Sequence, residues 1–579
     1  MIQAEDVWIG YGGHEVLQGA SFCLGKGERC GLIGRNGAGK STLFRLIAGK
    51  EVPDKGVIFM PKGYRIGVLE QQIRFSEKTV IEEATLGLEV EDWHKAERIL
   101  FGLGFNDAML ESNPEDLSGG YKLRVQLAKA LVAEPDCLLL DEPTNYLDIL
   151  SIRFLTRFLQ RWQGEMILIS HDLEFLDEVT THMMGIRRGK ILKIKGESTD
   201  LFEMIAEEER LHEGARVTLE KKKAHLQSFV DRFGAKASKA GQAQAKAKMI
   251  AKLPALERLK ELYNLEFHFH QVPFMGKKML EAKDVEFSYT EKPLIEGFSI
   301  EVEKGDRIAI IGKNGYGKST LLRLLSGELK PQAGEVDASP NLKMGYFGQT
   351  SIERLNPELK IEDEISSANI KLNLGQVRGI CGLMMFSGDL AKKPISVLSG
   401  GEKSRVLLGK ILARPCNILL LDEPTHHLDI ESIEALIDAI EEFEGTVIIV
   451  THSEWALRRI PLNKLVVCHN ESQELFYGTY DEFLEKKGWD EEKPQVAKPV
   501  KAAPPLPKPN PSKKISAETK KCEERIELVE KSLEKNNAKL AEIAHQGNGA
   551  EIRDLVTQIE KENQELKGLY EQLETFYNR

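Results

Sequence analysis

The stretch GLIGRNGAGKST at residues 31–42 recurs in nearly the same form, AIIGKNGYGKST, at residues 309–320. Both fit the pattern G-x-x-x-x-G-K-[ST] of a phosphate-binding loop, or P-loop. Gly37 and Gly39 let the backbone approach a phosphate without a Cβ in the way, and Lys40 reaches the terminal phosphates. A chance match to a glycine-rich turn is the alternative for one loop, but it does not explain two copies that each lie between an apolar strand-like run and a helical run.

The two halves of the chain repeat one plan. Lys318 lies 278 positions after Lys40, and Glu423 lies 281 positions after Glu142, so the second half carries three extra residues between these landmarks. This spacing indicates a tandem duplication rather than a short-period repeat. Strands alternate with helical segments in each half, which predicts an α/β fold of two tandem domains, each with a largely parallel sheet.

Each half contains an apolar run that ends in Asp-Glu, CLLLDEPT in the first and ILLLDEPT in the second. A buried strand would deliver both carboxylates to the C-terminal edge of the sheet, where nucleotides bind in α/β folds. We expect Asp141 and Asp422 to hold Mg²⁺, and Glu142 and Glu423 to orient the attacking water. The alternative, an exposed acidic pair at a strand end, is disfavoured by the P-loop that accompanies each pair.

Other residue types recur at equivalent positions in the two halves. They are His171 and His452, Gln71 and Gln349, and Tyr11 and Tyr289. Each histidine follows an apolar strand and is either a hydrogen-bonded structural residue or a contact to the γ-phosphate. The glutamines would ligate Mg²⁺ or sense the water, and these assignments depend on the whole set. Each tyrosine either stacks on adenine or packs in the core.

The segment LSGG also occurs twice, beginning at Leu117 and at Leu398. A serine and two glycines that open a helix form a second anion site. Because each half already has a P-loop, we expect the LSGG of one half to complete the phosphate site of the other half. Two ATP molecules would then be held between halves that pack head to tail.

With these motifs the sequence resembles the ATP-binding cassette superfamily, and the resemblance covers residues 1 to about 485. It implies an ATPase that uses ATP and Mg²⁺, with Glu142, Glu423, His171, His452, Gln71 and Gln349 as catalytic residues. It implies Mg²⁺ contacts at Ser41, Gln71, Asp141, Ser319, Gln349 and Asp422. The ATP contacts that it implies are Tyr11, Gly34, Asn36, Gly37, Gly39, Lys40, Ser41, Thr42, Ser118, Gly119, Gly120, Tyr289, Gly312, Asn314, Gly315, Gly317, Lys318, Ser319, Thr320, Ser399, Gly400 and Gly401.

The second half departs from the first in three places. Tyr316 takes the place of Ala38 in the P-loop, Ser453 takes the place of Asp172 after the histidine, and HHLD replaces NYLD. We therefore expect unequal ATP sites, the second being the slower.

Composition narrows the class of protein. The 579 residues carry a net charge of −11 and contain no apolar run of 18 or more residues, so we expect a cytoplasmic protein without a membrane segment. No Cys-x-x-Cys pair is present, which disfavours a zinc site and a disulfide framework. Against this acidic background, residues 221–252 contain nine basic residues and one acidic residue. This basic segment suggests a polyanionic partner, and its alternative is a solvated charged helix.

Twin cassettes with this connecting segment resemble the ABC-F family of translation factors, and LQSFVDRFGAKASKAGQAQAKAKMI is especially similar. The resemblance implies binding in the ribosomal E site, contact with rRNA and P-site tRNA, and release after ATP hydrolysis. The RNA contacts that it implies are Arg232, Lys236, Lys239, Lys246 and Lys248. It also implies a monomer without a membrane subunit. Two alternatives stay open, a DNA-associated ATPase that binds branched DNA and the motor of a transporter with separate membrane subunits.

The sequence divides into five predicted parts. They are a first cassette at 1–197, a basic helical hairpin at 198–278, a second cassette at 279–487, a proline-rich linker at 488–512 and an antiparallel coiled coil at 513–579. In the last part, Ile526, Val529 and Leu533 begin a heptad-like pattern. This tail has 12 basic and 14 acidic residues, which gives no electrostatic case for binding nucleic acid. A passive helical hairpin and a partner contact both stay open.

Overall fold

The structure is a computed structural model. It describes residues 1–12, 14–69, 75–88, 93–233, 248–249, 266–348, 352–425, 428–469 and 472–489, with Arg525 and Lys561. The chain forms one compact unit over Met1–Glu492 and a second over Lys493–Arg579. In the second unit, the two described residues are helical, and the rest of the predicted coiled coil lies outside the described residues. Among the described residues, no helix combines the length and the apolar character needed to cross a bilayer.

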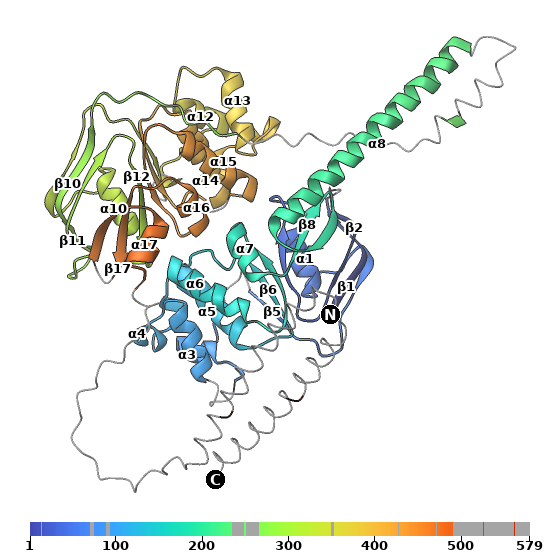
Figure 1. Ribbon diagram of the computed structural model, residues 1–579, viewed down its shortest axis with the longest axis horizontal. Helices are drawn as coiled ribbons and strands as arrows, with labels where there is room; N and C mark the ends of the chain where they lie inside the picture. Colours follow the sequence, from blue (N-terminus) through green and yellow to red (C-terminus); the bar gives the residue numbers. More distant parts are fainter. Residues whose placement is uncertain are drawn as a thin grey trace, which may run out of the picture. The chain divides into compact units, whose positions relative to one another are not determined.

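The first half of the larger unit is a doubly wound α/β domain followed by a long helix (Figure 1). Its elements are β1 (Ile2–Tyr11), β2 (His14–Leu24), β3 (Arg29–Ile33), α1 (Lys40–Ile47), β4 (Lys55–Phe59), β5 (Ile66–Val68), α2 (Val80–Ala84), α3 (Trp93–Gly102), α4 (Asp107–Leu110), α5 (Gly119–Val132), β6 (Cys137–Asp141), α6 (Ile149–Gln160), β7 (Glu165–Ile169), α7 (Leu173–Val179), β8 (His182–Arg187), β9 (Lys190–Lys195) and α8 (Ser198–Phe233).

The predicted parallel sheet is present in this half. The strand order is β5-β6-β7-β3-β8-β9, in which the first five strands are parallel and β9 pairs antiparallel with β8. All five residues of β7 and the first four of β6 are buried, as expected for strands covered by helices on both faces. A separate antiparallel sheet, β2-β1-β4, adds a layer that the alternation of strands and helices did not predict.

The second half repeats this architecture. Its elements are β10 (Lys278–Phe287), β11 (Ile295–Glu303), β12 (Arg307–Gly312), α10 (Lys318–Leu325), β13 (Ala333–Ala338), β14 (Met344–Phe347), α12 (Ile361–Ser367), α13 (Leu374–Leu383), α14 (Gly400–Ala413), β15 (Ile418–Asp422), α15 (Ile430–Glu442), β16 (Thr446–Val450), α16 (Glu454–Arg459), β17 (Lys464–His469), β18 (Ser472–Tyr477) and α17 (Tyr480–Lys486). The orders β14-β15-β16-β12-β17-β18 and β11-β10-β13 match those of the first half, so the duplication seen in the sequence is also a duplication of topology.

Helix α8 forms the start of the connection between the halves. Its base is fixed in the first half, where Leu201 and Ile205 are buried in the core and Ser198 donates hydrogen bonds to Asp177. The described part of α8 extends to Phe233, and the rest of the predicted hairpin up to residue 265 lies, apart from residues 248–249, outside the described residues. At the other end of the connecting segment, Phe267 is buried in the core of the second half. That core therefore includes residues before 279, the predicted start of the second cassette.

Each half contributes one buried isoleucine to the apolar core of the other half. Ile149, the first residue of α6, is fully buried and belongs to the apolar core of the second half. Ile430, the first residue of α15, belongs to the core of the first half and is 7% exposed. These residues occupy equivalent repeat positions, so the contact between the halves is reciprocal, as in an interface with twofold symmetry.

We predict that Ile149→Ala destabilises the larger unit by about 3 kcal/mol, because it removes buried methyl groups and leaves a cavity. The midpoint of urea unfolding measures this. The matched control is Ile370→Ala, since Ile370 is 93% exposed and its truncation removes little buried surface. Equal midpoints for the two variants would contradict the exchanged core contact.

Candidate functional site

The first P-loop depends on glycines in left-handed backbone conformations. Gly37 has φ 81° and Gly39 has φ 104°, which residues with a Cβ rarely adopt. A Cβ on Gly39 would also lie 2.6 Å from Cγ1 of Val16, whereas a Cβ on Gly37 would meet nothing within 4 Å. Helix α1 begins directly after Gly39, so its free N–H groups point towards the loop.

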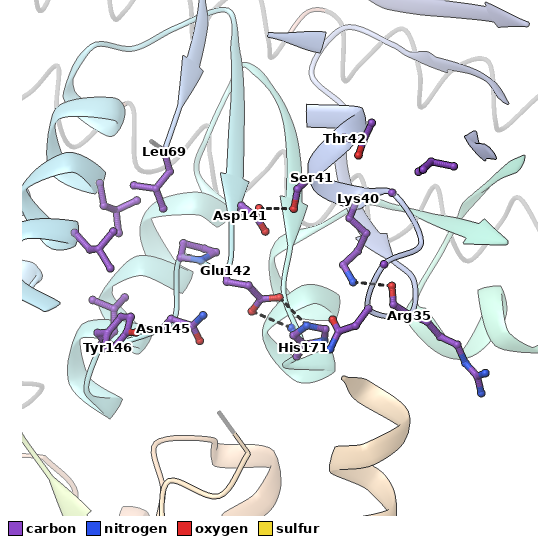
Figure 2. A pocket seen from close by; sticks show the side chains of 18 of the residues that line it. Arg35, Lys40, Ser41, Thr42, Leu69, Asp141, Glu142, Asn145, Tyr146 and His171 are labelled. Atoms are coloured by element: carbon purple, nitrogen blue, oxygen red, sulfur yellow. Dashed lines mark hydrogen bonds and ion pairs between the residues drawn. The ribbon is translucent and has the colours of Figure 1, made fainter. Parts of the chain in front are cut away.

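The side chains of the first P-loop meet the end of β6 (Figure 2). The Nζ of Lys40 donates hydrogen bonds to the carbonyl oxygens of Gly34, at 2.5 Å, and Arg35, at 3.4 Å. The hydroxyl of Ser41 donates to Oδ2 of Asp141 at 3.1 Å. A serine and an aspartate oxygen this close form the type of hard-oxygen pair that Mg²⁺ selects, so the donor set fits that ion.

The second P-loop has the same arrangement. Lys318 donates to the carbonyl oxygens of Gly312 and Lys313 at 3.0 and 2.7 Å. The hydroxyl of Ser319 donates to Oδ1 of Asp422 at 3.1 Å. The structure thus brings together, in both halves, the lysine, serine and aspartate that the sequence predicts.

Each glutamate after the strand faces the histidine of its own half. Nε2 of His171 lies 3.3 Å from Oε1 of Glu142, and the equivalent distance between His452 and Glu423 is also 3.3 Å. The backbone N–H of His171 donates to Glu142, which fixes the carboxylate from a second direction. Both glutamates have positive φ, 50° for Glu142 and 49° for Glu423, which is a strained conformation typical of functional positions.

Burial changes the proton affinity of these groups. Burial, together with the charge of the preceding aspartate, raises the pKa of Glu142 and of Glu423 to about 8. Burial, together with the positive charge of Lys40, lowers the pKa of His171 to about 4. A neutral imidazole has one donor and one acceptor nitrogen, so His171 can contact a phosphate while it stays near the glutamate.

A cavity of about 580 Å³ adjoins these residues, within the usual size range for small-ligand sites. Its lining includes Tyr11, Lys40, Asp141 and His171, the residues predicted to contact adenine, phosphate and metal. Tyr11 is 47% exposed and Tyr289 is 59% exposed, so the alternative that they are core aromatics is wrong. Because their rings are exposed, both tyrosines can stack on an adenine base.

The LSGG segments open helices, as the sequence indicates. Ser118 is the N-cap of α5 and Ser399 is the N-cap of α14. The hydroxyl of Ser399 is engaged in a capping box with Glu402, whereas the side chain of Ser118 makes no capping hydrogen bond. The two LSGG serines therefore have different local partners, a further inequality between the halves.

The second P-loop contacts the first half. The backbone N–H of Asn314 donates to Oδ2 of Asp148 at 3.2 Å, and its side-chain amide donates to the carbonyl of Tyr146 at 3.0 Å. Tyr121, beside the first LSGG, is half-buried; this burial raises its pKa, and Tyr316 of the second P-loop adds to the rise. The first LSGG helix therefore begins near the second P-loop, as a site shared between the halves requires.

The first P-loop contacts the second half through a different residue. Nε of Arg35 donates to Oε1 of Glu431 at 2.9 Å, and its second contact to that carboxylate completes a bidentate ion pair. The equivalent repeat positions hold Lys313 and Leu150, so the second site cannot form the same pair.

Several predicted site residues are not tested by the structure. Gln71, Gln349, Lys236, Lys239 and Lys246 lie outside the described residues. Of the other predicted RNA contacts, the backbone of Arg232 belongs to α8, and Lys248 is exposed. All seven roles stay predictions.

Arg124 and Asp148 were missed by the motif analysis. Arg124 is 2% exposed and donates to the carbonyl oxygens of Leu103 and Tyr146, at 2.7 and 2.6 Å. It also lies 3.7 Å from Asp148, which caps α6. The duplication could have pointed to Arg124, because an arginine, Arg405, occupies the equivalent position in the second half.

The comparisons with known proteins match both P-loops and the connecting helix. A family model described as ABC transporter matches residues 17–145 and 295–426, and a second model with that description matches residues 184–269. The chain is 36% identical over 535 residues to the probable ATP-binding protein YbiT of Escherichia coli O157:H7, an alignment that covers 84% of this chain and 100% of the relative. It is 33% identical over 522 residues to ATP-binding cassette sub-family F member 3 of Mus musculus, covering 83% and 73%.

Solved structures share the fold. The RNase-L Inhibitor superposes with a TM-score of 0.58 at 22% identity, covering 83% of this chain and 92% of the other. A complex of an archaeal ribosomal stalk protein with an archaeal ribosome recycling factor matches with a TM-score of 0.57 at 22% identity, covering 80% and 87%. At this identity the likeness establishes the twin-domain fold.

We predict that Gly39→Ala impairs ATP binding at the first site more than Gly317→Ala impairs it at the second. Both substitutions strain a left-handed residue by about 1–2 kcal/mol. Only Gly39→Ala adds a close clash, since the nearest atom to a Cβ on Gly317 is 3.3 Å away. Titration with a fluorescent ATP analogue should show loss of one site for Gly39→Ala and weakening of about tenfold for Gly317→Ala. Gly49→Ala, with φ 69° and open space, is the control for strain alone.

Proposed function

Because the chain belongs to the ABC-F family of ATP-binding cassette proteins, we propose that it is an ATPase that binds the ribosome in its ATP-bound state and leaves after hydrolysis. Its site would be the E site, with the connecting segment directed towards P-site tRNA. The ATPase activity follows from the family. The ribosome as partner rests on one observation, a basic segment held between two cassettes.

The ATPase step uses residues that the structure brings together. Lys40 and the start of α1 would bind the β- and γ-phosphates, and Glu142 would orient the attacking water. Nε2 of His171 lies 3.3 Å from this carboxylate, and the imidazole would hold the γ-phosphate. Mg²⁺ would be held by Ser41 and Asp141 and would neutralise charge on the phosphates.

The charge of the connecting segment favours RNA as the partner. Residues 198–220 of α8 carry seven acidic and two basic residues, whereas residues 221–252 carry one acidic and nine basic residues. The acidic part lies next to the first cassette, where Glu209 pairs with Arg187 and Arg188 at 3.0 and 3.4 Å. Along α8 the acidic residues thus lie at the end held by the first cassette, and Lys221, Lys222 and Lys223 lie farther along the helix.

The length of α8 matches a role in reaching a distant partner. At 1.5 Å per residue its 36 residues span roughly 54 Å. Figure 1 shows it leaving the first cassette without interruption. A helix of this length carries the basic residues from Lys221 onward away from its base in the first cassette, so RNA contact and ATP hydrolysis would be made by separate parts of the molecule.

The names of similar proteins agree with this proposal. The relatives include sub-family F members, and two similar solved structures are titled as a ribosome recycling factor with a stalk protein and as a ribosome-bound assembly. A DNA-associated ATPase is the second candidate, because a basic helix also fits the backbone of DNA. The two candidates differ in which nucleic acid recruits the ATP-bound state.

The double variant Glu142→Gln with Glu423→Gln should bind ATP but hydrolyse it at least about 100-fold more slowly, because a neutral amide cannot act as a base. We expect it to sediment with ribosomes through sucrose in ATP and to stay at the top of the gradient in ADP. The control is the same protein without nucleotide. Failure to sediment, with ATP binding shown separately, would contradict the ribosome assignment, and branched DNA would be tested next.

Reversing Lys236, Lys239 and Lys246 to glutamate should weaken ribosome binding by at least tenfold at physiological salt and leave ATP affinity unchanged. Each lost phosphate contact also lowers the dependence of affinity on salt. The control reverses three exposed cassette lysines, Lys26, Lys304 and Lys371. Equal affinities for the two triple variants would show that the basic segment is not the contact.

A further inference from the structure

Two helices that follow the recurring histidines lie against each other across the two cassettes. Helix α7 begins after His171, with Asp172 as its N-cap, and α16 begins after His452, with Ser453 as its N-cap. Each N-cap side chain accepts a hydrogen bond from its own helix, at 3.1 Å from Phe175 and 3.4 Å in the second cassette. Each histidine is therefore attached to the end of its helix, and movement of the helix moves the histidine.

Charged side chains join these helices across the cassette boundary. Arg458 of α16 forms an ion pair with Glu174 of α7. Arg153 of α6 donates to Oε1 of Glu454 at 2.8 Å, and Arg458 donates to Oε2 of the same carboxylate at 2.8 Å. Arg458 also donates to Asp481 at 3.1 Å. Glu454 thus connects the two arginines into one network.

The position of this network makes it stronger than a typical surface pair. Four of its members are only partly exposed, at 17% for Glu454, 23% for Arg153, 30% for Glu174 and 35% for Arg458, whereas Asp481 at its edge is 61% exposed. Lower exposure reduces screening by water and salt. Isolated exposed pairs contribute little, but a connected set shares the entropic cost of ordering each side chain.

The network continues to the second ATP site. The N-cap of α6 is Asp148, which accepts the backbone N–H of Asn314 in the second P-loop at 3.2 Å. Oδ1 of Asn314 lies 3.2 Å from Nε2 of His452. The second P-loop is thus linked to the first histidine through α6 and Arg153, then through Glu454 and Arg458, and finally through Glu174 of α7.

Duplication alone does not explain these pairs. The repeat positions equivalent to Glu174, Arg458, Arg153 and Glu454 are Trp455, Asp177, Glu434 and Leu173. Neither mirror pair, Asp177 with Trp455 nor Glu434 with Leu173, has two opposite charges. The ion pairs across the boundary are therefore a feature of one arrangement of the two cassettes and not a result of their common origin.

We propose that Arg458 and Arg153 are positioning residues that couple hydrolysis at the two ATP sites. Their ion pairs hold the two histidine-bearing helices as one body, so the state of one site sets the position of the histidine in the other. This rests on the ATPase activity and is independent of the ribosome as partner. Neither arginine contacts the reacting atoms.

The test compares the effect of blocking the second site in two backgrounds. In the otherwise native chain, Glu423→Gln should lower kcat for ATP by at least fivefold, because the first site depends on the second. In an Arg458→Ala chain the same change should lower kcat by at most about twofold, because blocking the slower of two independent sites removes no more than half of the turnover. Equal factors in the two backgrounds, or a factor of two or less in the native chain, would overturn the proposal.

Three further variants separate coupling from folding. Arg459→Ala is the matched control, since Arg459 is on the same helix but pairs with Asp438 and Glu441 inside its own cassette. It should retain the fivefold effect. Glu174→Gln keeps the shape of the side chain and removes its charge, so it should reduce the effect to about twofold with KM for ATP within twofold of the native value. Arg153→Ala should do the same. Retention of the full effect in Glu174→Gln and Arg153→Ala would show that the network has no coupling role.

Discussion

The structure depends on the order of three parallel strands. In each cassette, the strand before His171 or His452 lies between the P-loop strand and the strand that ends in Asp-Glu, in the orders β6-β7-β3 and β15-β16-β12. Because parallel strands end at the same edge of a sheet, the lysine, the two acids and the histidine converge there, although the lysine lies more than 100 positions before the acids in the sequence. The contacts of Ser41 with Asp141 and of His171 with Glu142 are consequences of this order.

A second level of organisation comes from the contact between the cassettes. Ile149 and Ile430 are exchanged reciprocally, and they directly follow the aspartates that cap α6 and α15. The polar contacts around this exchange are unequal. Asn314 binds Asp148 on one side, whereas Arg35 binds Glu431 on the other. A nearly symmetric apolar contact thus supports two ATP sites with different surroundings, which is the physical basis for expecting that they work at different rates.

The sequence predicted the duplicated architecture because its strongest signals are local. A P-loop, an acid pair after an apolar run and a serine-glycine helix start each need only a few neighbouring residues to be recognised, and every one that the structure describes lies where it was expected. The antiparallel sheets were not predicted, since their pairing joins β4 to β1 over some 50 residues. Arg124 was also missed, because an arginine in a helix does not reveal that it is 2% exposed and bound to two carbonyl oxygens.

The sequence by itself determined that this protein has two phosphate-binding loops with their acids and histidines, separated by a connecting segment that is basic over residues 221–252. Motif spacing is enough for this, because the chemistry of each loop is set by its own residues. Only the tertiary structure decided which residues of one cassette meet the other. The repeat positions of Arg458 and Glu174 give no sign of their pairing, because ion pairs between distant segments depend on how helices from two domains are packed and not on the local sequence of either one.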